Sequence, residues 1–144
     1  RATEWGVDPA RVGAMGFSAG GELVWLASSR FDGGKPDAAD AIERQGSRPD
    51  FLGFIYPGRS GDIQPATNSP PAFLACAYND RADIGEGLAE VYLRFRRAGV
   101  PAELHIYGSG GHGFGVRAKN TKPVARWLMR FEEWMDDRGF LKAR

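Results

Sequence analysis

The chain has 144 residues, of which 42% are hydrophobic and 26% charged, and its 19 basic and 18 acidic side chains give a formal net charge of +1. This length is typical of one globular domain. The sequence has no basic block that would bind nucleic acid or an anionic membrane surface, and no apolar run long enough to cross a bilayer, so we expect neither nucleic acid nor a membrane as a partner. No signal peptide is visible, and the sequence does not identify the compartment. With Cys76 as the only cysteine, an intramolecular disulfide is impossible.

Apolar runs of strand length recur along the chain. The first, at 12–17, ends in a glycine-rich turn, and residues 22–29 after it have helical character. Further runs at 51–57 and 73–78 close with turn-forming residues, and 102–108 is a fourth, more alternating candidate. Runs that are apolar on both faces suit a parallel sheet covered by helices on each side.

Helical patterns alternate with these strands. The first has apolar residues at helical spacing, namely Leu88, Val91, Tyr92 and Phe95. The second lies between Pro123 and Gly139, with an apolar face of Val124, Trp127, Leu128, Phe131, Trp134 and Met135. The polar stretches 30–50 and 58–71 are predicted loops, the former with a candidate helical turn at 37–45. The pattern predicts an α/β fold in one domain, with a predominantly parallel sheet of about four strands flanked by helices.

Gly16-Phe17-Ser18-Ala19-Gly20 matches the pattern G-x-S-x-G. A strand precedes Ser18 and a helix follows it, which is the context of a nucleophile elbow. The glycines allow strand and helix to approach closely around a strained turn. The alternative is a Gly-Ser turn without a catalytic role.

A serine nucleophile needs a base, and the chain has two histidines. His112 lies in a glycine-rich loop directly after the last strand and is the candidate base, whereas His105 lies within that strand and is expected to be structural. Asp80 follows strand 73–78 at the same sheet edge and is the candidate acid, with Asp83 as the competitor. The order Ser18, Asp80, His112 is that of α/β-hydrolases.

At these residues the chain resembles the α/β-hydrolase superfamily, and more narrowly the esterases grouped with acetylxylan and feruloyl esterases. The resemblance covers the segments 5–28, 48–58, 70–80, 93–115 and 123–141, of which Gly-Gly-His-Gly-Phe-Gly at 110–115 is the most specific. The family's acid loop usually reads Asp-x-x-Val-Pro, and Asp80-Arg81-Ala82-Asp83-Ile84 departs from it.

The resemblance implies a serine carboxylesterase for short-chain, acetyl-type esters, without cofactor or metal. In it, Ser18 attacks the ester, His112 takes its proton, Asp80 orients His112 and the N–H of Ala19 stabilises the oxyanion. The alternatives are a serine peptidase of the prolyl-oligopeptidase type and a weakly active or inactive hydrolase fragment that self-associates.

Only the C-terminal half of the family's fold is matched, from the nucleophile strand onward, and the loop that normally donates a second oxyanion N–H does not precede Ser18. Strand 12–17 then becomes an apolar edge, which invites pairing with another chain. We therefore expect a homo-oligomer, a dimer through this edge; a missing N-terminal partner fragment would cover the edge equally well.

Other conspicuous residues are expected to be structural. Cys76 is predicted to be a small buried hydrophobe and not a reactive thiol. A solvated helix face is predicted for Arg94, Arg96 and Arg97, and apolar helix faces for Trp25, Trp127 and Trp134.

Overall fold

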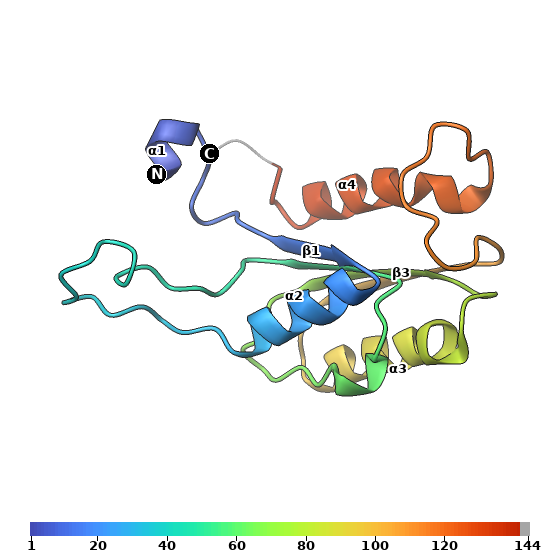
Figure 1. The fold of residues 1–144 in the computed structure, drawn as a ribbon, viewed down its shortest axis with the longest axis horizontal. Coiled ribbons are helices and arrows are strands. Elements are labelled where there is room, and N and C mark those ends of the chain that lie inside the picture. Colours follow the sequence, from blue (N-terminus) through green and yellow to red (C-terminus); the bar gives the residue numbers. More distant parts are fainter. Residues whose placement is uncertain (142–144) are drawn as a thin grey trace.

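The computed structural model describes residues 1–141, which form a parallel four-stranded sheet with helices on both faces (Figure 1). The strands are β1 (Ala14–Phe17), β2 (Leu52–Ile55), β3 (Ala72–Ala77) and β4 (Ala102–Tyr107). They lie in the order β1-β2-β3-β4, and each neighbouring pair is parallel. All four predicted strands are present, and the α/β class is confirmed.

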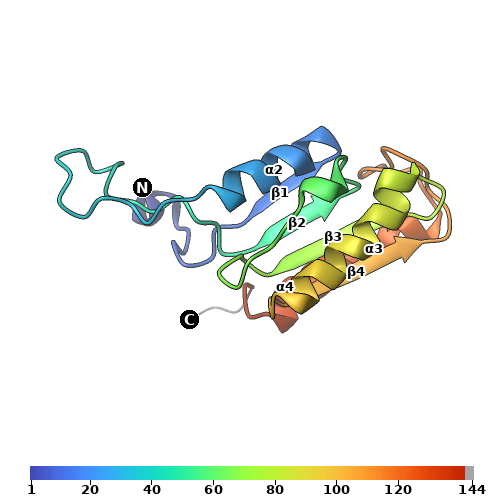
Figure 2. The same cartoon turned by 90° about the horizontal axis from the view of Figure 1, so that it is seen from below.

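Helices cover both faces of the sheet. This cover consists of α2 (Ala19–Ser29), α3 (Ala82–Arg97) and α4 (Trp127–Asp137). The four-residue helix α1 (Ala2–Trp5) has no buried residue, and the short 3-10 helices are η1 (Ser60–Asp62) and η2 (Pro123–Arg126). Figures 1 and 2 show α2 and α3 side by side on one face and α4 on the other. Within residues 1–141, no helix has the length and apolar character needed to cross a membrane.

The interior of the sheet is the most deeply buried part of the molecule. All residues of β2 and β3 are buried, as their continuous apolar runs predict. On one face α3 adds the buried side chains of Ile84, Leu88, Val91 and Phe95, with Tyr92 partly buried beside them. This core fixes the carboxyl ends of the strands, where the predicted site residues lie.

The C-terminal helical segment differs in part from the predicted pattern. A 3-10 turn precedes α4, and Trp127, Phe131 and Trp134 are buried whereas Leu128 is 45% exposed. The prediction that Leu128 shares the apolar face is wrong. The buried residues Val124 and Trp127 are three apart across the 3-10 turn, and this spacing sets the face that α4 continues, with Leu128 to one side of it.

The predicted arginine face is also only partly correct. Arg96 and Arg97 are exposed, but Arg94 is partly buried and its Nη1 donates hydrogen bonds to the carbonyls of Ser60 at 2.9 Å and Ile63 at 3.2 Å. Arg94 therefore ties the loop after β2 to α3, and Ser60 strengthens this link by donating from its hydroxyl to the carbonyl of Asp83 at 2.6 Å.

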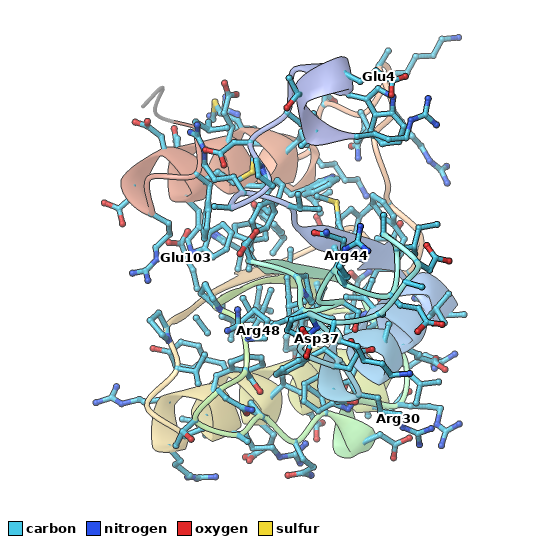
Figure 3. All side chains as sticks on the ribbon, turned by 90° about the vertical axis from the view of Figure 1, so that its left-hand side faces the viewer. Glu4, Arg30, Asp37, Arg44, Arg48 and Glu103 are labelled. Atoms are coloured by element: carbon cyan, nitrogen blue, oxygen red, sulfur yellow. The ribbon has the colours of Figure 1, made fainter. Side chains whose placement is uncertain are left out.

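The predicted loop at 30–50 protrudes from one end of the molecule, and its labelled side chains Asp37, Arg44 and Arg48 face the reader in Figure 3. Its candidate helical turn at 37–45 forms only turns and bends. Cys76 lies fully buried in β3 as predicted, and burial raises the pKa of its thiol to about 12.

Candidate active site

Ser18 occupies a sharp turn between β1 and α2. Its backbone has φ 50° and ψ −121°, a positive φ that is uncommon for a residue with a side chain. A side chain on Gly16 would collide with the backbone carbonyl of Gly20, whereas a Cβ on Gly20 would meet open space. Of the two glycines in G-x-S-x-G, Gly16 is therefore the one that this turn requires.

The three residues predicted from the sequence meet at the carboxyl edge of the sheet. Ser18 Oγ lies 2.8 Å from Nε2 of His112, and Nδ1 of His112 lies 3.1 Å from both carboxylate oxygens of Asp80. An ionised carboxylate only accepts hydrogen bonds, so the ring proton belongs on Nδ1 and leaves Nε2 free to accept from the serine hydroxyl.

Burial differs across this hydrogen-bonded chain. The Asp80 side chain is 0% exposed and that of His112 is 39% exposed. Asp80 Oδ1 also accepts the backbone N–H of Arg81 at 2.8 Å. The Asp80 carboxylate is thus shielded from water and held by a backbone N–H, while one side of the His112 imidazole stays open to solvent.

The competing residues have other partners. Asp83 forms an ion pair with Arg81, with two N–O distances of 2.9 and 2.8 Å, and this hydrogen bonding lowers the pKa of Asp83. His105 lies 2.7 Å from Glu103 Oε1 and its ring packs against Phe73 in the core. Of the two aspartates, Asp80 is the one in contact with His112.

The loop that carries His112 is fixed at both ends by residues that sequence reasoning did not select. Asn79 Oδ1 accepts the N–H groups of Gly110 at 3.1 Å and Gly111 at 2.9 Å. At the other end, Nε1 of Trp127 donates to the carbonyl of Gly115 at 2.9 Å. Only the position of Asn79 beside Asp80 in the sequence could have pointed to its role.

The first turn of α2 borders a cavity of about 630 Å³ between this helix and the loop after β2. Its lining includes Ala19 and Leu23 of α2, and Arg59 and Asp62 of the loop, which form an ion pair of 2.6 Å. Ala19 is the first residue of α2, so its N–H precedes the hydrogen-bond ladder of the helix and suits a developing oxyanion. Residues 1–141 contain no group of three or more His, Cys, Asp or Glu side chains arranged to hold a metal ion.

Comparison with known proteins adds relatives of named activity. Residues 2–138 match the model of the dienelactone hydrolase family. An acetylxylan esterase of Xylanibacter ruminicola is 32% identical over 167 aligned residues, which cover 94% of this chain and 31% of the esterase.

Solved structures share the fold. An acetyl ester-xyloside bifunctional hydrolase of Caldicellulosiruptor lactoaceticus superposes with a TM-score of 0.87 at 29% identity, covering 97% of this chain and 61% of that one. Esterase 2 of Thermogutta terrifontis, at 21% identity, shares the fold with a TM-score of 0.77 over 99% of this chain and 61% of its own. The chain thus spans about a third of the acetylxylan esterase and about three fifths of these two structures.

Proposed function

Because the chain belongs to the dienelactone hydrolase family, within the α/β-hydrolase superfamily, we propose that it is a serine carboxylesterase acting on short-chain, acetyl-type esters. The observation that carries the proposal is the continuous hydrogen-bonded chain from Ser18 through His112 to Asp80. The acetylxylan esterase and the acetyl ester-xyloside hydrolase among its relatives support the choice of acetyl esters.

The proposed reaction follows from the direction of these hydrogen bonds. Ser18 Oγ attacks the ester carbonyl while Nε2 of His112 takes the hydroxyl proton. Asp80 accepts the hydrogen bond from Nδ1–H of His112 and stabilises the imidazolium that forms. The N–H of Ala19 donates a hydrogen bond to the oxyanion. The intermediate then expels the alcohol, which takes the proton from His112 and leaves an acyl group on Ser18. Water deprotonated by His112 attacks this acyl-enzyme, and the acid leaves as the serine regains its proton.

The proposal is tested by hydrolysis of p-nitrophenyl acetate with the intact chain and its Ser18→Ala variant at equal folded concentration. We expect Ser18→Ala to lower kcat/KM by at least about a thousandfold, because the nucleophile is lost. Ser29→Ala, at the far end of the same helix, is the matched control and should retain the original rate. Equal rates for the intact chain and Ser18→Ala would reduce the activity to background cleavage and overturn the proposal.

We also propose that residues 1–144 form one domain, the half of an α/β-hydrolase from the nucleophile strand onward, and that two copies associate along β1. In support, β1 pairs only with β2 within residues 1–141, and Val12 beside it is 52% exposed. Sedimentation velocity should show a dimer that Val12→Lys shifts toward monomer. A monomer at all concentrations would contradict this association without affecting the proposed chemistry.

A further inference from the structure

We propose that Tyr56 is a positioning residue that fixes the plane of the His112 imidazole between Ser18 and Asp80. This inference rests on the proposed function, since it assigns the residue that keeps the base aligned. Tyr56 follows β2 directly and is 5% exposed. It touches neither Ser18 nor Asp80 through any hydrogen bond recorded between the described residues, so its effect would pass through His112.

The backbone of Tyr56 is held in a conformation that its side chain disfavours. Among residues 1–141, positive φ occurs at only three residues other than glycine, namely Ser18, Tyr56 and Arg59. The φ of Tyr56 is 39°, and the following Pro57 restricts its backbone further. Such a conformation is energetically unfavourable and persists only where the surroundings enforce it. One such restraint is the hydrogen bond from the N–H of Tyr56 to the carbonyl of Ala75, at 2.7 Å.

This backbone conformation places the Tyr56 ring between the end of β1, which leads to Ser18, and the loop that carries His112. The centroid of the Tyr56 ring lies 5.1 Å from that of His112, with the planes 65° apart, and 4.5 Å from that of Phe114, with the planes 80° apart. On another side it lies 6.0 Å from the ring of Phe17, the residue before Ser18. Tyr56 thus contacts both the end of the nucleophile strand and the histidine loop.

The other restraints leave a task for this ring. Asn79 and Trp127 hold the backbone of the histidine loop at Gly110, Gly111 and Gly115, but they do not touch the imidazole through a hydrogen bond. Asp80 holds Nδ1 and Ser18 contacts Nε2, and a ring held at these two atoms can still pivot about the line that joins them. Edge-on contact with a buried aromatic ring limits that pivot, because aromatic pairs have preferred orientations.

The ring of Tyr56 contacts His112, whereas its phenol oxygen interacts with the backbone N–H of Gly115 in the same loop. A Cβ built on Gly115 would lie 3.8 Å from the Tyr56 hydroxyl oxygen, so the hydroxyl approaches the loop backbone beyond His112. Burial raises the pKa of Tyr56 and outweighs the lowering by the Gly115 N–H, so the phenol is neutral at neutral pH. A phenylalanine at this position keeps the ring contact and loses only the link to Gly115, so it should retain most of the positioning effect, and an aliphatic residue should lose it.

Three variants separate the ring from the backbone strain. We expect Tyr56→Phe to keep kcat for p-nitrophenyl acetate within about threefold, and Tyr56→Leu to lower it by about 10- to 100-fold with KM nearly unchanged, since misalignment by about 1 Å costs on that order. Tyr56→Asn also removes the ring, but asparagine tolerates a positive φ. We therefore expect Tyr56→Asn to lose as much kcat as Tyr56→Leu and to unfold at a higher urea concentration than Tyr56→Leu. Phe95→Leu is the control: it removes a fully buried aromatic ring on α3, so it should lower stability and leave kcat per folded molecule unchanged.

A second readout does not depend on turnover. The chain has only two histidines, so the ring proton resonances of His112 can be assigned with a His105→Gln variant. We expect these resonances to shift or broaden in Tyr56→Leu and to match the original in Tyr56→Phe. Unchanged kcat and resonances in Tyr56→Leu would overturn the positioning role, and a raised KM at constant kcat would assign the ring to substrate contact instead. Failure of the proposed function would appear separately, as hydrolysis that survives Ser18→Ala.

Discussion

The two ends of the sheet are built differently. At the β3–β4 end, α3 buries four large apolar side chains and every residue of β3 is buried. At the β1 end, only one of the four residues of β1 is buried, and the buried residues of α2 are Gly21, Val24 and Ser28. Leu23 and Leu26 on that helix are 65% and 46% exposed. Helix α3 therefore packs more closely on the sheet than α2 does, although edge strand β4 itself has no buried residue. We call the part of the sheet under α3 the closed side and the part under α2 the open side.

The candidate site spans this division. Ser18 comes from the open side, between β1 and α2, whereas Asp80 follows the fully buried β3 and His112 follows β4, whose six residues are partly buried or exposed. The acid is thus organised by a complete core, and the base by the hydrogen bonds that Asn79 and Trp127 make to its loop. The serine instead depends on a tight turn and on its contact with His112, so local changes at the turn should affect activity more than they affect stability.

The largest expected effect is a difference in stability between two leucine-to-alanine substitutions, one on the closed side and one on the open side. Leu88→Ala on α3 removes a fully buried side chain and should cost about 2–5 kcal/mol, since it leaves a cavity in the core. Leu26→Ala on α2 removes a side chain that is 46% exposed and should change stability by about 0.5 kcal/mol or less. Urea unfolding of the two variants measures the difference. Equal losses would mean that α2 is covered in solution, as by a second copy along β1.

Much of this arrangement could be predicted from the sequence. Continuous apolar runs identify β2 and β3, and the carboxyl ends of parallel strands meet at one edge, so Ser18, Asp80 and His112 were expected to converge there. Other features have no local signal. The hydrogen bonds of Arg94 join residues about thirty positions apart in the chain, and a positive φ at Tyr56 contradicts the preference of a bulky residue. Tertiary packing decides both.

A smaller effect should separate the two glycines of the serine turn. Gly16→Ala forces a Cβ against the carbonyl of Gly20, and we expect it to cost about 1–3 kcal/mol of stability and most of the proposed esterase activity, because the turn must open. Gly20→Ala places its Cβ in open space within α2 and should stabilise the chain by up to about 1 kcal/mol. Urea unfolding and p-nitrophenyl acetate hydrolysis test both variants. Loss of activity in Gly20→Ala with normal stability would show that the Cβ blocks substrate.

The next comparison concerns the loop after β2, which the closed side holds through Arg94. Arg94→Met keeps the length of the side chain but removes the guanidinium hydrogen bonds to the carbonyls of Ser60 and Ile63, so we expect a loss of about 1–2 kcal/mol. Arg97→Met on the exposed side of α3 should be neutral. Limited proteolysis should cut residues 58–66 faster in Arg94→Met alone. Identical cleavage of both variants would mean that the loop holds its position without Arg94.

The smallest expected effect is a fall in the free energy of unfolding at alkaline pH, and it depends on β3 being shielded from water. Burial raises the pKa of the Cys76 thiol from 9.0 to about 12, so between these values the unfolded chain loses the proton while the folded chain keeps it. Unfolding is then favoured as pH rises, and the stability present below pH 9 should fall by about 1 kcal/mol by pH 10. Cys76→Ala lacks the ionisable thiol and therefore its contribution to this pH dependence. Burial also raises the pKa values of Tyr56 and Tyr107, but these tyrosines contribute equally to the original chain and to Cys76→Ala. Urea unfolding at pH 8, 9 and 10 should therefore give a steeper decline for the original chain than for Cys76→Ala. Parallel declines would mean that water reaches β3, and the contrast between a closed and an open side would then lose its main support.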